Sequence, residues 1–383
     1  MARLADARAR AGERLIDEAL AERSAANRAF FETESERLAR LCHRLAERFD
    51  RGGRLVAFGR TPSAGSDVRH VAVEFVHPVI VGKRALPAIG TPAEYVGLIV
   101  EADDIAMAFG DDVAEAVGVA RERGCLTVAF ASLGAEWEFV PAVADPSIRQ
   151  ELVETLYHVL WELVHVFFDH LRSNTQGAGA SSFLYPFLGE RAGDLDAVVD
   201  DVQRSILLKA EEIGALRAQT LTDNREVLLA AAAALRATFL AGRQVLALGN
   251  GGSATDAMDA VADFRADGRR AIDLTEDPAI LTAIANDIGT EAIFARQVIA
   301  YGRAGDVLLA LSTSGNSANV IAALAEARRR ELRTIALVGY DGGRVAAEQL
   351  ADHVIVTRSQ HIPRIQEAQA SAYHLLRELV EVQ

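Results

Sequence analysis

Residues 246–253 read LALGNGGS, an apolar run that ends on a glycine-rich turn, and a helical pattern follows it. Residues 56–63 read VAFGRTPS and repeat the arrangement. A strand–turn–helix unit that occurs twice in one chain indicates a duplicated domain. The turns and the helical patterns carry different polar residues, so the two copies are not chemically equivalent.

The other apolar runs are short and alternate with helical patterns, which is typical of parallel sheets covered by helices on both faces. We expect strands at 54–58, 104–109, 126–131, 244–248, 306–311, 333–338 and 353–356. Amphipathic helical patterns over about 10–50 and 202–239 precede the strands of each half. The predicted fold class is α/β, with two doubly wound, flavodoxin-like parallel-sheet domains and helical N-terminal lead-ins.

Small polar residues and glycine separate the halves, since residues 173–182 read SNTQGAGASS. Such a composition is typical of a linker. The predicted organisation is a first domain at 1–172, a linker at 173–200 and a second domain at 201–383.

Composition limits the classes of partner. The chain has 383 residues, half of them hydrophobic, and a formal net charge of −14, which argues against nucleic acid as a partner. Its two cysteines are too few for a disulfide framework. Neither a signal peptide nor a membrane span is expected. These features predict a cytoplasmic protein that does not bind a membrane.

Residues 312–317 read STSGNS at the end of an apolar run, and a helical pattern begins after them. Free backbone amides at a helix N-terminus, together with short hydroxyl side chains, suit the oxygens of a phosphate monoester. An ordinary serine-rich turn with a helix cap would look similar. The turn at 249–253 favours the phosphate site, because both turns would leave a parallel sheet at the edge where ligands bind.

The second half resembles a sugar isomerase (SIS) domain, and specifically the phosphoheptose isomerases. The resemblance is carried by residues 249–253, 285–289, 311–320 and 364–367. It covers about 205–383 closely and 30–170 in degenerate form, which implies a tandem duplication with a degenerate N-terminal copy. Members of this family convert sedoheptulose 7-phosphate into an aldoheptose phosphate. By this resemblance, the substrate-binding positions are Asn250, Gly251, Gly252, Ser253, Asp277, Ser312, Thr313, Ser314, Ser317 and Gln366.

The resemblance also implies a divalent metal, with zinc as the expected ion. The family places a histidine and a glutamate four residues apart on one helix, and a glutamine and a histidine eight apart on the last helix, as zinc ligands. The glutamate and the second histidine also act as acid and base. The first copy has the full set, namely His70, Glu74, Gln150 and His158.

The second copy keeps Gln366 and His374 at the same spacing, but Asp259 and Asp263 replace its first pair. Carboxylates in place of imidazole favour harder ions than zinc. Eight residues of helix rise about 12 Å, which is long for two ligands of one ion. Either the helix end is irregular, or the ligands converge from more than one chain.

The first copy has lost the phosphate loop. Phe109-Gly110-Asp111-Asp112 stands where the serine loop would be, and carboxylates would repel a phosphate. Because the losses are complementary, one hypothesis is a shared site, in which the second domain holds the phosphate and the first supplies the catalytic set. The competing hypothesis places all chemistry in the second domain, with Asp263 as base and His374 as its partner. The candidate catalytic residues are therefore Glu74, His158, Asp263 and His374.

Isomerising a ketose to an aldose requires a base, an acid and stabilisation of an enediolate. We expect an isomerase that interconverts sedoheptulose 7-phosphate and an aldoheptose 7-phosphate, acting as a homodimer with four SIS domains. The alternatives are an isomerase of another phosphosugar and a non-catalytic sensor or scaffold that binds a phosphosugar.

Overall fold

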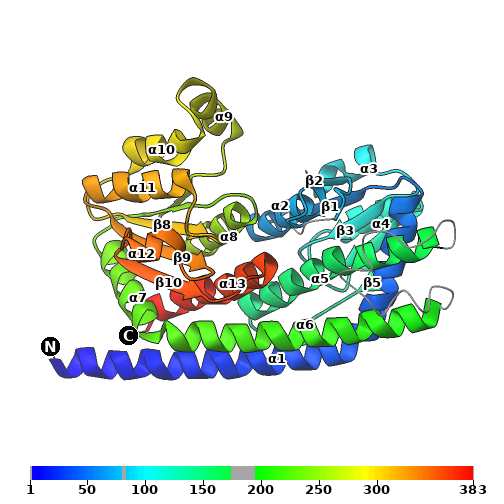
Figure 1. The fold of residues 1–383 in the computed structure, drawn as a ribbon, viewed down its shortest axis with the longest axis horizontal. Coiled ribbons are helices and arrows are strands. Elements are labelled where there is room, and N and C mark those ends of the chain that lie inside the picture. The colour runs from blue at the N-terminus through cyan, green and yellow to red at the C-terminus, as the bar shows by residue number, and fades with distance from the viewer. Residues whose placement is uncertain (1, 80–82, 174–194, 383) are drawn as a thin grey trace. The chain divides into compact units, whose positions relative to one another are not determined.

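The computed structural model describes residues 2–79, 83–173 and 195–382. These residues form two compact units. The N-terminal unit comprises Ala25–Glu212, and the C-terminal unit comprises Met1–Ser24 with Ile213–Gln383. Two long helices contribute to both units, α1 (Ala2–Asp50) and α6 (Leu195–Asp223) (Figure 1).

The N-terminal unit contains one parallel sheet with the strand order β2-β1-β3-β4-β5. Its remaining elements, in chain order, are β1 (Leu55–Gly59), α2 (Pro62–Val76), β2 (Ala88–Pro92), η1 (Ala93–Tyr95), α3 (Val96–Ile99), β3 (Ile105–Ala108), α4 (Ala114–Glu122), β4 (Leu126–Ala129), β5 (Trp137–Glu138) and α5 (Pro146–Ser173).

The C-terminal unit contains a second parallel sheet with the order β7-β6-β8-β9-β10. Its elements are α7 (Arg225–Leu240), β6 (Val245–Leu248), α8 (Gly252–Ala266), β7 (Ala271–Asp273), α9 (Pro278–Asp287), η4 (Thr290–Ala292), α10 (Ile293–Tyr301), β8 (Val307–Ser312), α11 (Ala318–Arg329), β9 (Arg333–Gly339), α12 (Gly343–Ala347), β10 (His353–Thr357) and α13 (Ile362–Val380). In each sheet, the strand that comes first in the sequence lies between the second and the third strands.

Alternation along each strand builds a core on both faces of the sheet. In β6, Val245 and Ala247 join the cluster formed with α7, α8 and α13, whereas Leu246 and Leu248 join the cluster formed with α10, α11 and α12. The strands of the N-terminal sheet divide in the same way. A strand buried on both faces reads as a continuous apolar run, which is why these strands could be predicted. The predicted α/β fold class is confirmed.

The N-terminal 24 residues pack with the C-terminal unit, whereas the sequence placed them in the first domain. Ile16 and Ala19 of α1 are buried in the same cluster as Leu228 and Leu235 of α7. Most of the predicted linker at 173–200 lies outside the described residues, and its last residues, from Leu195 on, begin α6. The predicted domain boundaries stay predictions.

Candidate functional site

The carboxyl ends of β6 and β8 lie side by side in the C-terminal sheet, because these two strands are paired in parallel. Between them the strand order reverses, since β7 lies on one side and β9 on the other. Such a reversal leaves a crevice at the carboxyl edge, where ligands of doubly wound sheets bind. Both predicted phosphate loops, residues 249–253 and 312–317, start at this point.

The serine loop is held in shape by its own hydroxyl groups. The Gly315 amide donates to Oγ of Ser312 at 3.2 Å, and the Asn316 amide donates to Oγ of Ser314 at 3.1 Å. Oγ of Ser317 lies 3.4 Å from Oγ of Ser312. Thr313 is anchored through its carbonyl, which accepts from the Gly339 amide at 3.0 Å. The structure therefore brings the four predicted hydroxyl residues together in one turn.

Gly315 is required by this conformation. Its φ is +62°, a region that disfavours side chains, and a Cβ there would lie 2.2 Å from the carbonyl oxygen of Gly342. The loop is thus pressed against the start of α12, where the Arg344 amide also donates to Oδ1 of Asn316 at 2.9 Å.

The turn after β6 is joined to the start of α11 by a reciprocal amide pair. Nδ2 of Asn250 donates to Oδ1 of Asn319 at 3.0 Å, and Nδ2 of Asn319 donates to Oδ1 of Asn250 at 2.9 Å. Gly251 precedes α8 with a φ of +58°, and Gly252 is the first residue of that helix. Ser253 is buried just behind them.

The N-terminus of α11 is open. Within the described residues, the backbone amides of Ala318 and Asn319 have no hydrogen-bond acceptor, and the N-cap Ser317 does not cap the helix with its side chain. Free amides and the helix dipole at this position suit an anion.

The corresponding helix of the N-terminal unit, α2, is closed. Oγ1 of Thr61 accepts from the Ala64 amide at 3.1 Å, and Pro62 at the first position has no amide hydrogen. Asp111 and Asp112 are exposed at the end of β3. This geometry favours the interpretation that phosphate binding was lost in the N-terminal unit.

Two predicted substrate-binding residues lie outside these turns. Asp277 caps α9, where its Oδ1 accepts from the amides of Ala279 at 2.8 Å and Ile280 at 3.1 Å. Gln366 is buried on α13, eight residues before His374. Gln366 follows Ile365, which lies beside Gly339, the residue whose amide anchors the Thr313 carbonyl.

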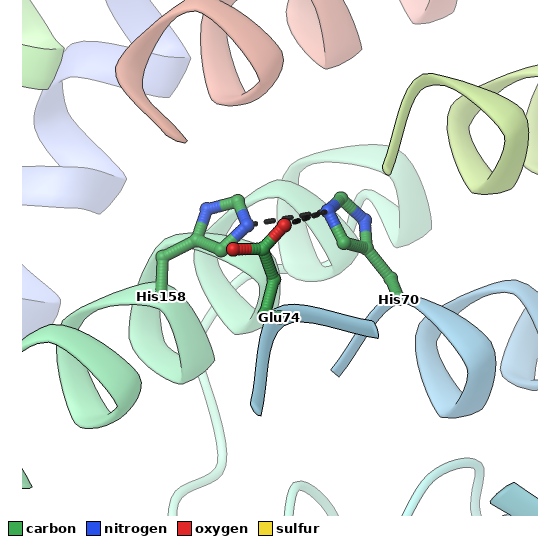
Figure 2. A group of neighbouring side chains, drawn as sticks. All are labelled: His70, Glu74 and His158. Carbon is green, nitrogen blue, oxygen red and sulfur yellow. Dashed lines mark hydrogen bonds and ion pairs between the residues drawn. The ribbon is translucent and has the colours of Figure 1, made fainter. Parts of the chain in front are cut away.

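A cluster of metal-binding side chains lies in the N-terminal unit. Figure 2 shows His70 and Glu74 on α2 and His158 on α5 pointing toward one another. The two Nε2 atoms are 3.2 Å apart, and Nε2 of His70 lies 3.9 Å from Oε1 of Glu74. The three side chains are buried, and their potential ligand atoms lie within 4.8 Å of one another.

These residues fit a divalent ion. Two nitrogens that each lie 2.0–2.1 Å from one tetrahedral zinc are separated by about 3.3 Å, close to the observed distance. Two histidines with one glutamate are also a common ligand set of catalytic zinc, which leaves a coordination position open. Burial, followed by the neighbouring His158, holds the pKa of His70 well below its usual value, which favours the neutral imidazole that binds metals.

Gln150, the fourth predicted ligand, bonds to Asp67, one turn before His70 on α2. Its Nε2 donates to Oδ1 of Asp67 at 3.0 Å, and the hydroxyl of Tyr157 donates to the same oxygen at 3.3 Å. Gln150 and His158 lie on one unbroken helix, and the backbone rise between them is about 12 Å.

The counterpart in the C-terminal unit is different. Nε2 of His374 lies 3.2 Å from Oδ2 of Asp259 and 3.7 Å from Oδ2 of Asp263. The hydroxyl of Tyr373 donates to the same Asp259 oxygen at 3.0 Å. Burial raises the pKa of Asp263 to about 6, while the charges of His374 and Arg377 oppose the shift.

Among the residues that the structure describes, Asp259, Asp263 and His374 do not form a three-ligand metal cluster. NH1 of Arg377 lies 3.2 Å from Oδ2 of Asp263 and already supplies a positive charge there. The predicted second metal set, Asp259, Asp263, Gln366 and His374, therefore does not fit an ion as the first set does.

Sequence reasoning missed Asp67, Tyr373 and Arg377. Asp67 lies one turn before His70 on the same helix, a spacing that could have drawn attention to it. Arg377 lies on α13, far along the chain from the aspartates of α8, so no local pattern could connect them.

A comparison with known protein families finds a match in the part of the chain that contains both predicted phosphate loops. The SIS domain model matches residues 210–339. The chain is 46% identical over 149 residues to the phosphoheptose isomerase of Citrifermentans bemidjiense, covering 37% of this chain and 77% of that protein. It is 40% identical over 193 residues to the phosphoheptose isomerase of Roseiflexus sp., covering 48% and 91%.

The chain belongs to the phosphoheptose isomerase family of SIS-domain proteins. The predicted resemblance is confirmed, and the chain is a member of an isomerase family.

The fold comparison extends over both units. The C-terminal domain of glucosamine-fructose-6-phosphate aminotransferase from Francisella tularensis covers 96% of this chain and 95% of its own, with a TM-score of 0.60 and 11% identity. This likeness concerns the fold alone. No helix in the described part of the chain is long and apolar enough to cross a membrane.

Proposed function

We propose that this chain is an aldose–ketose isomerase of phosphorylated sugars, with sedoheptulose 7-phosphate as its substrate. The observation that carries the proposal is the pair of turns where the C-terminal sheet reverses, with the open N-terminus of α11 beside the hydroxyls of Ser312, Ser314 and Ser317. The heptose specificity is proposed from relatives that are named phosphoheptose isomerases.

The serine loop would bind the phosphate group through hydroxyls and amides that the fold already holds in place. Asn250 and Asn319 hydrogen bond to one another between the turn after β6 and the start of α11. On substrate binding they would exchange these bonds for bonds to the hydroxyls of the sugar, which would orient it. Binding energy from the phosphate would thus position the distant end of the sugar for reaction.

The reaction requires a base that removes a proton from C1 of the ketose and an acid that delivers a proton to C2. The electron pair of the broken C–H bond forms the enediolate, and protonation at C2 regenerates a carbonyl at C1. Glu74 is the proposed base, and His158 is the proposed group that carries protons to and from the oxygens. A divalent ion held by His70, Glu74 and His158 would stabilise negative charge on oxygen.

Turnover, on this proposal, requires residues of both units. The competing assignment gives the base to Asp263 and its partner role to His374. The homodimer and the cytoplasmic location stay predictions from the sequence.

The proposal is tested by incubating the full chain with sedoheptulose 7-phosphate in D2O and following the sugar by proton NMR. We expect an aldoheptose 7-phosphate with deuterium at C2, because the base exchanges its proton with solvent. Tight binding without exchange would contradict an isomerase and favour the sensor. Exchange with a different ketose phosphate alone would contradict the heptose specificity.

The role of the serine loop in binding is tested with Ser312→Ala. Asp111→Ala in the N-terminal unit is its control. We expect the first to weaken binding of the phosphosugar by about tenfold, which is the loss of one hydrogen bond to a charged group. The control should leave binding unchanged, because Asp111 is exposed on the sheet that lacks the serine loop.

A further inference from the structure

Asp259 and Asp263 of α8 and its C-cap residue Asp267 lie along one face, because they follow one another at intervals of four residues. Three carboxylates along one stripe require a compensating positive charge nearby. In a family expected to bind a metal, such a stripe invites the assignment of a divalent ion.

The compensating charge is Arg377 on α13. Its NH1 lies 3.2 Å from Oδ2 of Asp263, while its Nε and NH2 donate to the two oxygens of Asp267 at 2.6 and 2.8 Å. The bidentate pair with Asp267 fixes the plane of the guanidinium. One arginine thereby neutralises two of the three aspartates.

The third aspartate, Asp259, contacts a tyrosine and a histidine instead of an arginine. Oδ2 of Asp259 accepts from the hydroxyl of Tyr373 at 3.0 Å and lies 3.2 Å from Nε2 of His374. Asp259, Tyr373 and His374 are buried, so these contacts are well shielded from water.

We propose that Arg377 takes the place of a metal ion in the C-terminal unit, so that the chain holds a single divalent ion, bound in the N-terminal unit. A divalent cation at Asp263 would be repelled by the guanidinium and would have to compete with it for the carboxylate. Because Arg377 is part of the chain, the charges of Asp263 and Asp267 are compensated without a metal ion.

The N-terminal unit lacks an arginine at the corresponding place. There the residue three positions after the second histidine, His158, is Trp161 rather than an arginine. At this position the N-terminal unit therefore has an uncharged ring where the C-terminal unit has a guanidinium. The inference rests on the part of the proposed function that assigns an ion to this cluster.

The test is the number of ions bound per chain, measured by elemental analysis after loading the full-length protein with Co2+ and removing free metal. We expect about one ion per chain for the wild type and none for His158→Ala. Arg377→Met should raise the count to about two, because Asp263 would lose the guanidinium and could close with Asp259 and His374 around an ion. Arg377→Lys keeps a positive charge and should stay at about one.

Asp267→Asn is the matched control, since it removes the outer partner of Arg377 and leaves the pair with Asp263 in place. Its count should equal that of the wild type. Thermal unfolding followed by circular dichroism checks that each variant is folded. The combination of Arg377→Met with His158→Ala should bind about one ion, and its cobalt absorption spectrum should differ from that of the wild type because the ligands differ.

The inference is overturned if the wild type binds two ions and loses one of them in Asp263→Asn, or if folded Arg377→Met gains none. If the wild type binds none and Arg377→Met binds one, the role of Arg377 stands and the metal site of the N-terminal unit fails. The role of Arg377 and the metal site of the N-terminal unit are therefore tested separately.

Discussion

Gly315 is the residue on which the shape of the phosphate loop depends most. With a φ of +62° and the Gly342 oxygen 2.2 Å from the place of a Cβ, Gly315→Ala must displace the loop. We expect a loss of phosphosugar affinity of at least about tenfold, and a free energy of unfolding lower by about 1–3 kcal/mol. Isothermal titration calorimetry and chemical denaturation measure the two effects.

Gly118→Ala is the control for that substitution. Gly118 lies in α4 with open space around its Cβ position, so alanine should stabilise the helix by up to about 1 kcal/mol without changing affinity. Equal affinities of the Gly315→Ala variant and the wild type would contradict the assignment of the loop.

Asp104 gives a pH-dependent prediction. It accepts from the backbone amides of Arg54 at 2.8 Å and Glu101 at 2.9 Å, and it pairs with the Arg54 guanidinium at 2.7 Å. Burial alone would raise the pKa of this carboxyl, but Arg54 and the amides outweigh it and hold the pKa below its usual value. A lowered folded-state pKa means that the carboxylate stabilises the fold above about pH 4 and stops doing so as the pH falls further.

Asp104→Asn should therefore lower the free energy of unfolding by about 1–3 kcal/mol at pH 7, and the difference should shrink below about pH 4. Urea denaturation of both proteins at pH 7 and at pH 3.5 measures this. A difference that stays constant across the two pH values would contradict the role of the charge.

The start of α11 is the element that receives the phosphate in this account. Asn319 holds the turn after β6 in place through its paired hydrogen bonds with Asn250, and its Oδ1 also caps the Val320 amide at 3.0 Å. We expect Asn319→Ala to raise the KM of the phosphosugar by about tenfold, because the variant loses the amide that is proposed to bond to the sugar.

Thr33→Ala is a control for Asn319→Ala, because Thr33 is an exposed residue of α1 that bonds only to the backbone of its own helix. Its steady-state kinetics should match those of the wild type. If the two variants have the same KM, the asparagine pair has no part in binding.

Among the secondary-structure elements, those that are long or apolar could be predicted from the sequence. The strands β1, β3, β4, β6, β8, β9 and β10 were predicted within one or two residues, because each is an apolar run; all of them except the edge strand β10 are buried on both faces. The short strands β2, β5 and β7 were missed. β2 contains glycine and proline, while β5 and β7 have two and three residues, too few for a period to be recognised.

The candidate site was predictable where a local spacing carries it. His70 and Glu74 lie four apart on α2, and the serine loop follows a buried strand, so both could be recognised. The bond from Gln150 to Asp67 could not be predicted from a local spacing, because it depends on the packing of α2 against α5. The pairing of Arg377 with α8 likewise depends on how two distant helices pack.

The same strand order in both sheets supports the predicted duplication. A corresponding pair of contacts supports it too. Asp104 accepts from the residue that precedes β1, and Asp306 accepts from the Gln244 amide, which precedes β6, at 3.2 Å. Two units that repeat both a topology and a buried polar contact are what a tandem copy would produce.

Across the whole molecule, the N-terminal 24 residues form part of the C-terminal core. Ile16 is fully buried there, and Arg23 pairs with Glu378 at 3.0 Å. Deleting residues 1–24 should therefore destabilise the C-terminal unit by about 2–5 kcal/mol, since at least one large buried side chain is lost.

Hydrogen exchange followed by mass spectrometry measures this effect unit by unit. Amides of α7 and α13 should exchange faster in the deletion variant, while those of β1, β3 and β4 should keep their protection. Unchanged exchange in α7 and α13 would contradict the assignment of residues 1–24 to this core.

We propose that turnover depends on the histidine–glutamate cluster of the N-terminal unit as well as on the phosphate loops of the C-terminal unit. The most direct measurement is turnover of sedoheptulose 7-phosphate by Glu74→Gln, with phosphosugar affinity measured on the same protein and Asp263→Asn as the comparison. Glu74→Gln should lose turnover by at least about 100-fold, while its affinity should stay within about twofold of the wild type. Full turnover by Glu74→Gln, with turnover lost in Asp263→Asn, would contradict it and place the chemistry in the C-terminal unit.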